Sequence, residues 1–373
     1  MAKGSDARYR AALARLLVEP QTPIDLADRE LFVAAQQEGV GGLLLAGLLQ
    51  NGTALPDADR QLAERLIGEQ AAWAMRLRHA SARVFAALNR EGIPFLSLRG
   101  PAVAEPLYGK LAPLRPQSDI DLLIDEGEQE SARALLAALG YRRNRHYPDI
   151  YSRGDIAIDL HREALGAERI RAWRHLTPLS NADLFAASTQ GQLAGEAALQ
   201  LHDSMLLAYL AFHALKHSCA RLIWLWDIAL LARRIEHAGG WEEVQSTAAR
   251  FGLQRPLYYV LAYAQAHLAA PVPNALLNGL RPMMGWRERR LFARYMAHRQ
   301  IPYMAERLFA RMQPDLRHRI EFWRETIYPR YEVRQQIAGA GCVRCNFTRK
   351  RLKQVAGAIW QLLGEGVTLR RGR

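Results

Sequence analysis

The apolar run at residues 119–125, DIDLLID, opens with two aspartates, Asp119 and Asp121. Its pattern predicts a β-strand, and residues i and i+2 of a strand point to the same side. The two carboxylates therefore lie side by side, where they repel each other unless a cation lies between them. Mg²⁺ prefers oxygen ligands and often binds a few carboxylates together with substrate phosphates. The pair thus predicts a metal site at the start of this strand.

A third carboxylate is expected from a neighbouring strand. Asp159 stands in the otherwise apolar run IAIDLH at residues 156–161. Asp155 is the alternative third acid, although it falls in a predicted turn. A purely structural interpretation of the first pair also stays open, in which Asp119 caps a turn and Asp121 is a solvated residue of an edge strand.

The spacing of apolar residues changes twice along the chain. A helical period runs to residue 90 and includes one long helix over 56–90, and it returns from about residue 200. The sequence therefore predicts an α+β protein with a small mixed-sheet domain embedded between mainly helical regions. The expected segments are a helical N-terminal region (1–90), the α/β domain (91–200) and a helical C-terminal domain with a basic tail (201–373).

Within the α/β domain, short strands surround one crossover helix. A Gly-Asp dipeptide at 154–155 is the predicted hairpin turn between two of the strands. The predicted elements are strands at 93–98 and 119–125, a helix over 126–140, and a strand–turn–strand unit over 141–163.

Composition narrows the class of protein. The formal charge of +13 and the pI near 10 favour an anionic partner, which leaves nucleotides, nucleic acid, an anionic membrane and an acidic peptide open. No apolar run reaches the roughly 20 residues of a transmembrane helix, and the charged N-terminus lacks the features of a signal peptide. Three cysteines are too few for a disulfide framework. We therefore expect a reduced, cytoplasmic protein without a transmembrane segment.

Several of these stretches together carry a family resemblance. FLSLRGPAVAEPLYGKLAPLRPQSDIDLLID, then GY and IAIDLH, resembles the nucleotidyltransferase fold of the DNA polymerase β superfamily. With the later stretch HALKHSCARLIWLWDIALL it resembles, more narrowly, a bacterial branch of uncharacterised nucleotidyltransferases. The resemblance implies that Asp119, Asp121 and Asp159 bind Mg²⁺, with Mn²⁺ as the alternative. It also implies that Asp159 serves as, or positions, the base for an attacking hydroxyl.

The resemblance also points to a phosphate-binding turn at RGPA, residues 99–102. Gly100 matches the glycine of that turn, but the serine usual in the superfamily is absent, and Arg99 is the expected cationic substitute. Arg can bind phosphate bidentately, which makes Arg115 a second candidate beside the aspartates. The full set of expected nucleotide-binding residues is Arg99, Gly100, Lys110, Arg115 and Ser118, with ATP the favoured donor.

Histidines supply the expected substrate contacts. His213 and His217 are spaced i, i+4 on one helix face, but the sequence between them lacks the glutamate of a zinc-protease motif. The resemblance implies that His213, Lys216 and His217 face the catalytic cleft; polar packing at the domain interface is the alternative. His161, on the strand face of Asp159, is expected to contact substrate, to support a metal ligand without binding the ion itself, or to be a buried, hydrogen-bonded residue. Asp227 is expected to cap a helix or pair with a basic residue at that interface.

Two C-terminal features are ambiguous. The Cys-x-x-Cys at 342–345 lacks the second pair of a zinc ribbon, so two free thiols are expected. The basic amphipathic segment at 347–373 suits either contact with a membrane or nucleic acid, or coverage of an apolar groove.

These features predict an enzyme that moves a nucleoside monophosphate from a nucleoside triphosphate onto a hydroxyl or phosphate of an acceptor. The resemblance makes a peptide natural product, a glycan or a small molecule the acceptor to consider. Two alternatives stay open: a toxin-type transferase that modifies tRNA or protein, and a non-catalytic nucleotide- or peptide-binding module.

Overall fold

A computed structural model provides the structure of the protein. Every helix in the part of the chain that it describes is too short or too polar to span a lipid bilayer. The Cys-x-x-Cys and most of the basic C-terminal segment lie outside this part. The described residues are 7–22, 28–52, 55–145, 147–163, 165, 170–301, 303–338, 346–350 and 352.

The described strands form one seven-stranded mixed sheet in the order β3-β4-β5-β2-β1-β7-β6. The central pair, β2 and β5, is parallel, and β1 runs antiparallel to β2. The α+β prediction with flanking helical regions is confirmed. The strands are β1 (Phe95–Ser97), β2 (Ile120–Ile124), β3 (Arg142–Arg143), β4 (Ile150–Arg153), β5 (Ile156–His161), β6 (Ser188–Leu193) and β7 (Glu196–Leu201).

Helices precede, interrupt and follow the sheet along the chain. They are α1 (Ala7–Val18), α2 (Arg29–Glu38), α3 (Gly41–Gln50), α4 (Asp57–Arg90), α5 (Pro101–Tyr108), α6 (Gln129–Ala138), α7 (Asn181–Ala186), α8 (Asp203–Lys216), α9 (Leu222–Ala238), α10 (Trp241–Phe251), α11 (Gln254–His267), α12 (Asn274–Leu280), α13 (Trp286–Met296), α14 (Met304–Met312), α15 (Leu316–Ile327) and α16 (Tyr331–Ala338). Short 3₁₀ segments are η1 (Gly109–Leu114), η2 (Glu126–Glu128) and η3 (Arg171–His175).

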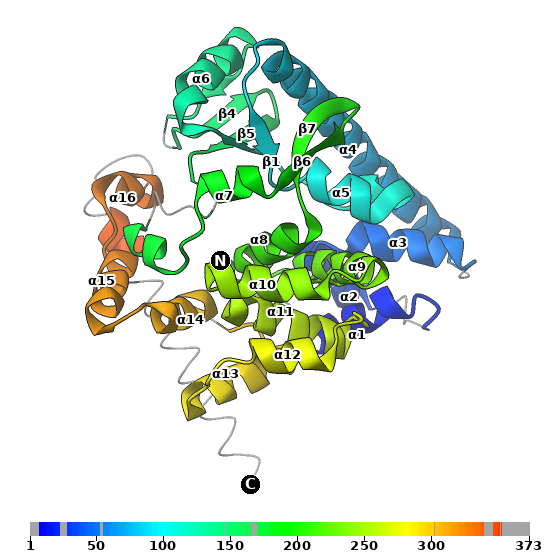
Figure 1. Ribbon diagram of the computed structural model, residues 1–373. Coiled ribbons are helices and arrows are strands. Elements are labelled where there is room, and N and C mark those ends of the chain that lie inside the picture. Colours follow the sequence, from blue (N-terminus) through cyan, green and yellow to red (C-terminus); the bar gives the residue numbers. More distant parts are fainter. Residues whose placement is uncertain are drawn as a thin grey trace.

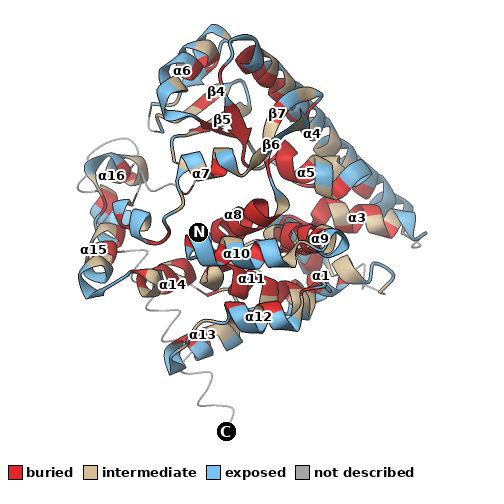
Figure 2. Ribbon diagram, viewed as in Figure 1, coloured by how far each residue is buried: buried red, intermediate tan, exposed pale blue. Residues whose placement is uncertain are grey.

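The sheet separates two hydrophobic cores. On one face, α4 and α6 bury apolar residues such as Phe85 and Leu136 against Ile158 and Leu122 of the strands. The opposite face of the sheet looks toward α8 and the helical part of the molecule (Figure 1). The buried residues in Figure 2 follow this division, with one layer under α4 and α6 and another among α8, α9 and α11. Side chains that alternate along β2 and β5 therefore point into two different environments.

The N-terminal helices divide between these two cores. Leu13 of α1, Leu31 of α2 and Leu44 of α3 pack in the same core as α8, α9 and α11. The long helix α4 instead lies along the sheet (Figure 1). Residues 1–90 are thus contiguous in sequence but serve both the sheet and the helical core.

Most sequence-predicted elements of the α/β region are present. The long helix predicted over 56–90 is α4, and the predicted hairpin is β4–β5, with Gly154 in the left-handed region at φ 60°. The antiparallel hairpin β6–β7 was not predicted. Its turn contains Ala194 and Gly195, both at positive φ, and an Ala-Gly pair is a weaker turn signal than Asn-Gly.

A buried ion pair joins the sheet region to the helical core. Arg115, which follows η1, donates from Nε and Nη2 to the two carboxylate oxygens of Asp227 in α9, at 2.8 and 2.7 Å. The Tyr108 hydroxyl donates to the same carboxylate at 2.6 Å. Arg115 and Asp227 are 6% and 1% exposed. The expectation that Asp227 pairs with a basic residue is confirmed.

Removal of one member of this pair should destabilise the protein strongly. Asp227→Ala leaves the Arg115 guanidinium buried without its counter-ion, which costs about 3–5 kcal/mol of unfolding free energy. Urea denaturation measures the loss. The matched control is Glu19→Ala, which breaks the exposed Arg15–Glu19 pair and should change stability by about 1 kcal/mol or less. Similar small losses in both variants would contradict the interpretation.

Candidate active site

Asp121 and Asp159 lie directly beside each other on neighbouring strands. The parallel register pairs Asp121 of β2 with Asp159 of β5. Because β2 lies between β1 and β5, it is an interior strand, and Asp121 is only 3% exposed. The alternative that Asp121 is a solvated residue of an edge strand is therefore wrong. Two carboxylates meet on the sheet face that looks toward α8.

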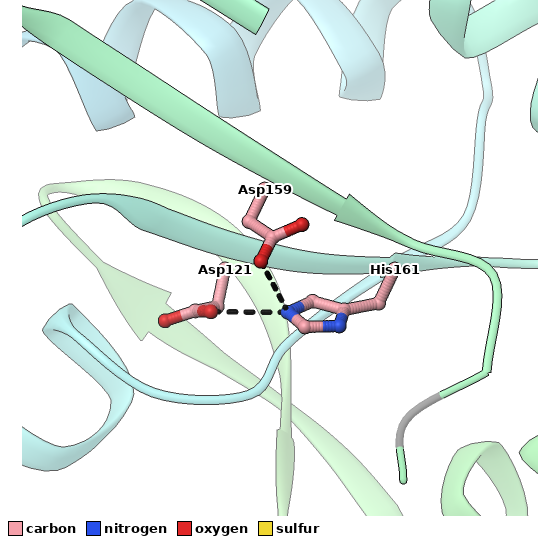
Figure 3. A group of neighbouring side chains, drawn as sticks. All are labelled: Asp121, Asp159 and His161. Carbon is pink, nitrogen blue, oxygen red and sulfur yellow. Dashed lines mark hydrogen bonds and ion pairs between the residues drawn. The ribbon is translucent and has the colours of Figure 1, made fainter. Parts of the chain in front are cut away.

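His161 completes a compact group with these aspartates (Figure 3). Its Nε2 atom lies 3.0 Å from Oδ1 of Asp121 and 3.5 Å from Oδ2 of Asp159. The three side chains each offer one ligand atom, and these atoms all lie within 4.8 Å of one another. The imidazole nitrogen thus points between the two carboxylates.

Arg99 reaches the same carboxylate from the turn after β1. Its Nη2 donates to Oδ1 of Asp121, and its Nη1 lies 2.8 Å from Nε2 of His213 in α8. A backbone hydrogen bond keeps the start of this turn next to β2, because the Leu98 amide donates to the Asp121 carbonyl at 3.2 Å. Gly100 follows at φ 61°, a conformation that favours glycine, and the chain then turns into α5. A cation therefore already contacts the predicted metal ligand.

Asp119 lies at the margin of this group. It is the residue before β2 and is half-buried, and the exposed Ser118 donates from Oγ to its Oδ1 at 2.8 Å. It is not one of the three side chains whose ligand atoms gather within 4.8 Å. Its role as a metal ligand stays a prediction.

Burial and mutual charge perturb the acids in different directions. Burial and the charge of Asp121 raise the pKa of Asp119 to about 6. Burial also raises the pKa of Asp159, against the opposing effect of His161. Burial alone would raise the pKa of Asp121 too, but Arg99 and His161 outweigh it and hold that pKa well below its usual range. The site therefore keeps Asp121 ionised through its cationic neighbours.

Arg115 and Lys110 are the other cations that were predicted to bind the nucleotide. Both oxygens of Asp227 bind the Arg115 guanidinium, as described above. Lys110 is exposed on η1. Their contacts with a nucleotide stay predictions.

The predicted histidine face on α8 forms an aromatic cluster. The rings of His213 and His217 have centroids 4.7 Å apart, and each ring is 5.4 Å from Trp224. Burial and the adjacent Arg99 hold the pKa of His213 well below its usual value, so its ring is neutral. Lys216 donates to the Leu165 carbonyl at 3.2 Å.

A cleft of about 730 Å³ opens beside the carboxylates. Asp159, His161 and Lys216 all line it. Its other walls come from the segment before β4, from η3 and from α16, and they carry both acidic and basic side chains. Among these are Asp149, Arg162, Arg171, Arg174, Arg330 and Glu332.

The donor set suits a divalent cation. Two carboxylate oxygens and one imidazole nitrogen converge, and carboxylates and imidazole are both common metal ligands. The guanidinium of Arg99 on Asp121 shows independently that the group attracts positive charge.

Sequence analysis did not predict that Arg99 pairs with Asp121, or that His161 bridges the two acids. The spacing of Asp159 and His161 on one strand face was the available signal for the latter.

Comparison with known proteins gives a family match. A family model described as uncharacterised nucleotidyltransferase matches residues 26–269, which is well over half of the chain. The matched range includes the whole sheet and α8. No curated protein and no solved structure matches the chain.

Burial of Asp119 and the nearby charge of Asp121 should make the metal-free protein less stable at neutral pH, where Asp119 is ionised. Because the folded-state pKa of Asp119 is raised to about 6, ionisation above that pH opposes folding. Asp119→Asn should therefore raise the unfolding free energy by roughly 1–2 kcal/mol at pH 7.5 in EDTA. The gain should shrink as the pH falls through 6 and vanish below about 3, where the acid is protonated in both states.

Urea unfolding of both proteins at pH 7.5 and 4.5 measures this gain. The control is Asp155→Asn, an exposed acid in the β4–β5 turn that pairs loosely with Arg76 at 3.5 Å. It should show no such pH-dependent gain. An Asp119→Asn effect that is equal at both pH values would show that ionisation of Asp119 is not its cause.

Proposed function

Because the chain belongs to the uncharacterised nucleotidyltransferase family, we propose that it transfers a nucleoside monophosphate from a nucleoside triphosphate to an acceptor hydroxyl or phosphate. The observation that carries the proposal is the register of β2 and β5, which sets Asp121 against Asp159 at the edge of a cleft. Paired acids beside a substrate-sized cleft suit metal-assisted phosphoryl chemistry. The same features favour membership of the wider DNA polymerase β superfamily.

In this proposal the acids hold the metal. Asp121 and Asp159, with Asp119 from the strand entrance, would bind Mg²⁺ or Mn²⁺. The bound ion would offset charge on the attacking and leaving oxygens of the α-phosphate. Asp159 is 29% exposed at its side chain and lines the cleft, so it is the acid best placed to orient an acceptor hydroxyl and accept its proton.

The turn after β1 is the proposed phosphate site. A Cβ at Gly100 would lie 3.3 Å from Oε1 of Gln117 and 3.6 Å from the Asp119 carbonyl, and the positive φ of this residue favours glycine there. Arg99 supplies a guanidinium there, and exposed Lys110 and Ser118 lie on the segment between the turn and β2. ATP is the favoured donor. Arg115 would support this segment through Asp227 rather than bind phosphate itself.

The cleft is the proposed acceptor site. Lys216 and His161 lie on its wall, and the buried His213 of α8 and the exposed His217, which caps that helix, are the further proposed contacts. Its mixed acidic and basic lining suits a polar acceptor such as a peptide or a glycan better than a uniformly anionic one. We place this activity in the cytoplasm, where nucleoside triphosphates are available.

A second candidate function is nucleotide binding without transfer. The observation that favours it is the ion pair of Arg99 with Asp121, which engages a predicted metal ligand directly. A protein that kept this pair in the presence of nucleotide would bind its ligand without forming the metal site.

Calorimetry with ATP, GTP, CTP and UTP, in Mg²⁺ or in EDTA, tests the proposal. We expect one nucleotide to bind only with the metal. Asp159→Asn should weaken that binding about tenfold or more, the scale seen when a metal site loses even an outer partner. Asp155→Asn, on the same hairpin but in its turn, should bind like the wild type.

Absence of any metal-dependent nucleotide binding would contradict the transferase proposal. The two candidate functions separate in a second assay, in which pyrophosphate release is followed with pools of peptide, glycan or tRNA as acceptors. Release that Asp159→Asn abolishes identifies a transferase, and the responsive pool identifies the acceptor class. Tight binding without release from any pool favours the non-catalytic module.

A further inference from the structure

We propose that His161 is a nitrogen ligand of the metal and that the site therefore selects a transition-metal ion such as Mn²⁺ over Mg²⁺. This inference rests on the proposed function for the presence of a metal, and it departs from a site built from carboxylates alone. It concerns which atoms hold the ion, so it can fail while nucleotide transfer stands.

The spacing of the three ligand atoms fits one ion. Ligands at about 2.1 Å from a metal lie roughly 3.0 Å apart in octahedral geometry and roughly 3.4 Å apart in tetrahedral geometry. The His161 nitrogen lies 3.0 Å from the Asp121 oxygen and 3.5 Å from the Asp159 oxygen. Two of the three separations are therefore close to those around a common ion, and all three atoms lie within 4.8 Å of one another. Figure 3 shows the nitrogen directed between the two carboxylates.

The backbone holds His161 firmly in this position. It pairs with Leu123 in the parallel register of β2 and β5, at the end of the strand. The buried side chain of Gln129, at the start of α6, donates to the His161 carbonyl at 3.4 Å and to the Ile124 carbonyl at 3.0 Å. The Gln129 side chain therefore links the ends of β2 and β5 by hydrogen bonds. The His161 side chain is 13% exposed, so its ring has little freedom to turn toward solvent.

The identity of the third ligand decides which ion is favoured. Mg²⁺ prefers an all-oxygen environment, whereas imidazole suits transition metals. Mn²⁺ accepts both carboxylate and imidazole ligands. A site with Asp121, Asp159 and His161 therefore favours Mn²⁺ over Mg²⁺ more than a site with three carboxylates would. Asp119, outside the compact group, remains free to meet the ion through a water or through the nucleotide.

Mn²⁺ itself is the probe for this inference. Its binding to the whole protein is measured by electron paramagnetic resonance and by competition with Mg²⁺, each with and without a non-hydrolysable nucleoside triphosphate. The expected spectrum shows coupling to a directly bound nitrogen. We expect Mn²⁺ to bind more tightly than Mg²⁺. Neither readout depends on catalysis.

Two substitutions at residue 161 make the test specific. His161→Gln should remove the nitrogen coupling and weaken Mn²⁺ binding about tenfold or more. His161→Glu offers an oxygen ligand in the same place, so it should keep a metal site, lose the coupling and shift preference toward Mg²⁺. The control is His79→Gln, an exposed residue of α4 on the other side of the sheet, and it should change nothing. Circular dichroism checks that each variant is folded.

Three outcomes would overturn the inference. The first is Mn²⁺ binding without nitrogen coupling, and the second is an unchanged Mn²⁺ to Mg²⁺ preference in His161→Glu. The third is no Mn²⁺ binding under any condition. If nucleotide still binds with Mg²⁺ in any of these cases, the transferase proposal survives and His161 is a hydrogen-bonding partner of the acids.

Discussion

Asp121 and Asp159 carry like charges on adjacent parallel strands, and Asp121 has almost no contact with solvent. Such an arrangement is unfavourable unless positive charge lies nearby, because burial removes the water that would otherwise screen the repulsion. Arg99 supplies that charge in the structure, and His161 adds to it when its ring is protonated. Their contacts keep Asp121 ionised even though burial alone would favour its protonated form. The residues around Asp121 are therefore arranged so that positive charge lies beside its carboxylate.

The fold brings Arg99, His161 and the neutral His213 together from three directions. Arg99 comes from the turn after β1, and the positive φ of Gly100 allows the chain to leave that turn into α5. His161 comes from the end of β5, and His213 approaches from α8 in the helical part of the molecule. A second buried pair, Arg115 with Asp227, joins the segment before β2 to α9. The helical region thus contributes to the electrostatics of the sheet as well as to its packing.

Sequence reasoning succeeded where the signal is local. The strand period places Asp121 in β2, and the lone acid in an apolar run places Asp159 in β5, because alternation along a strand is visible in a few residues. The partners of Arg99 and Arg115 depend on which elements pack together, and no short pattern encodes that. The hairpin β6–β7 was not predicted because its sequence signals are weak. Its turn lacks a strong turn dipeptide, and its strands alternate only partly between buried and exposed residues.

The charges of the site also bear on how many metal ions it would bind. Asp119, Asp121 and Asp159 carry up to three negative charges, and Arg99 offsets one of them. One divalent ion would offset the other two, so a single ion together with Arg99 brings the nucleotide-free site to neutrality. A second ion would leave two positive charges, which the phosphates of a nucleoside triphosphate could neutralise. In the proposed function, an ion bound at Oδ1 of Asp121 would compete with Arg99 for that oxygen and would favour release of the guanidinium toward those phosphates. The arginine that contacts the acid in the structure would then be near the bound donor.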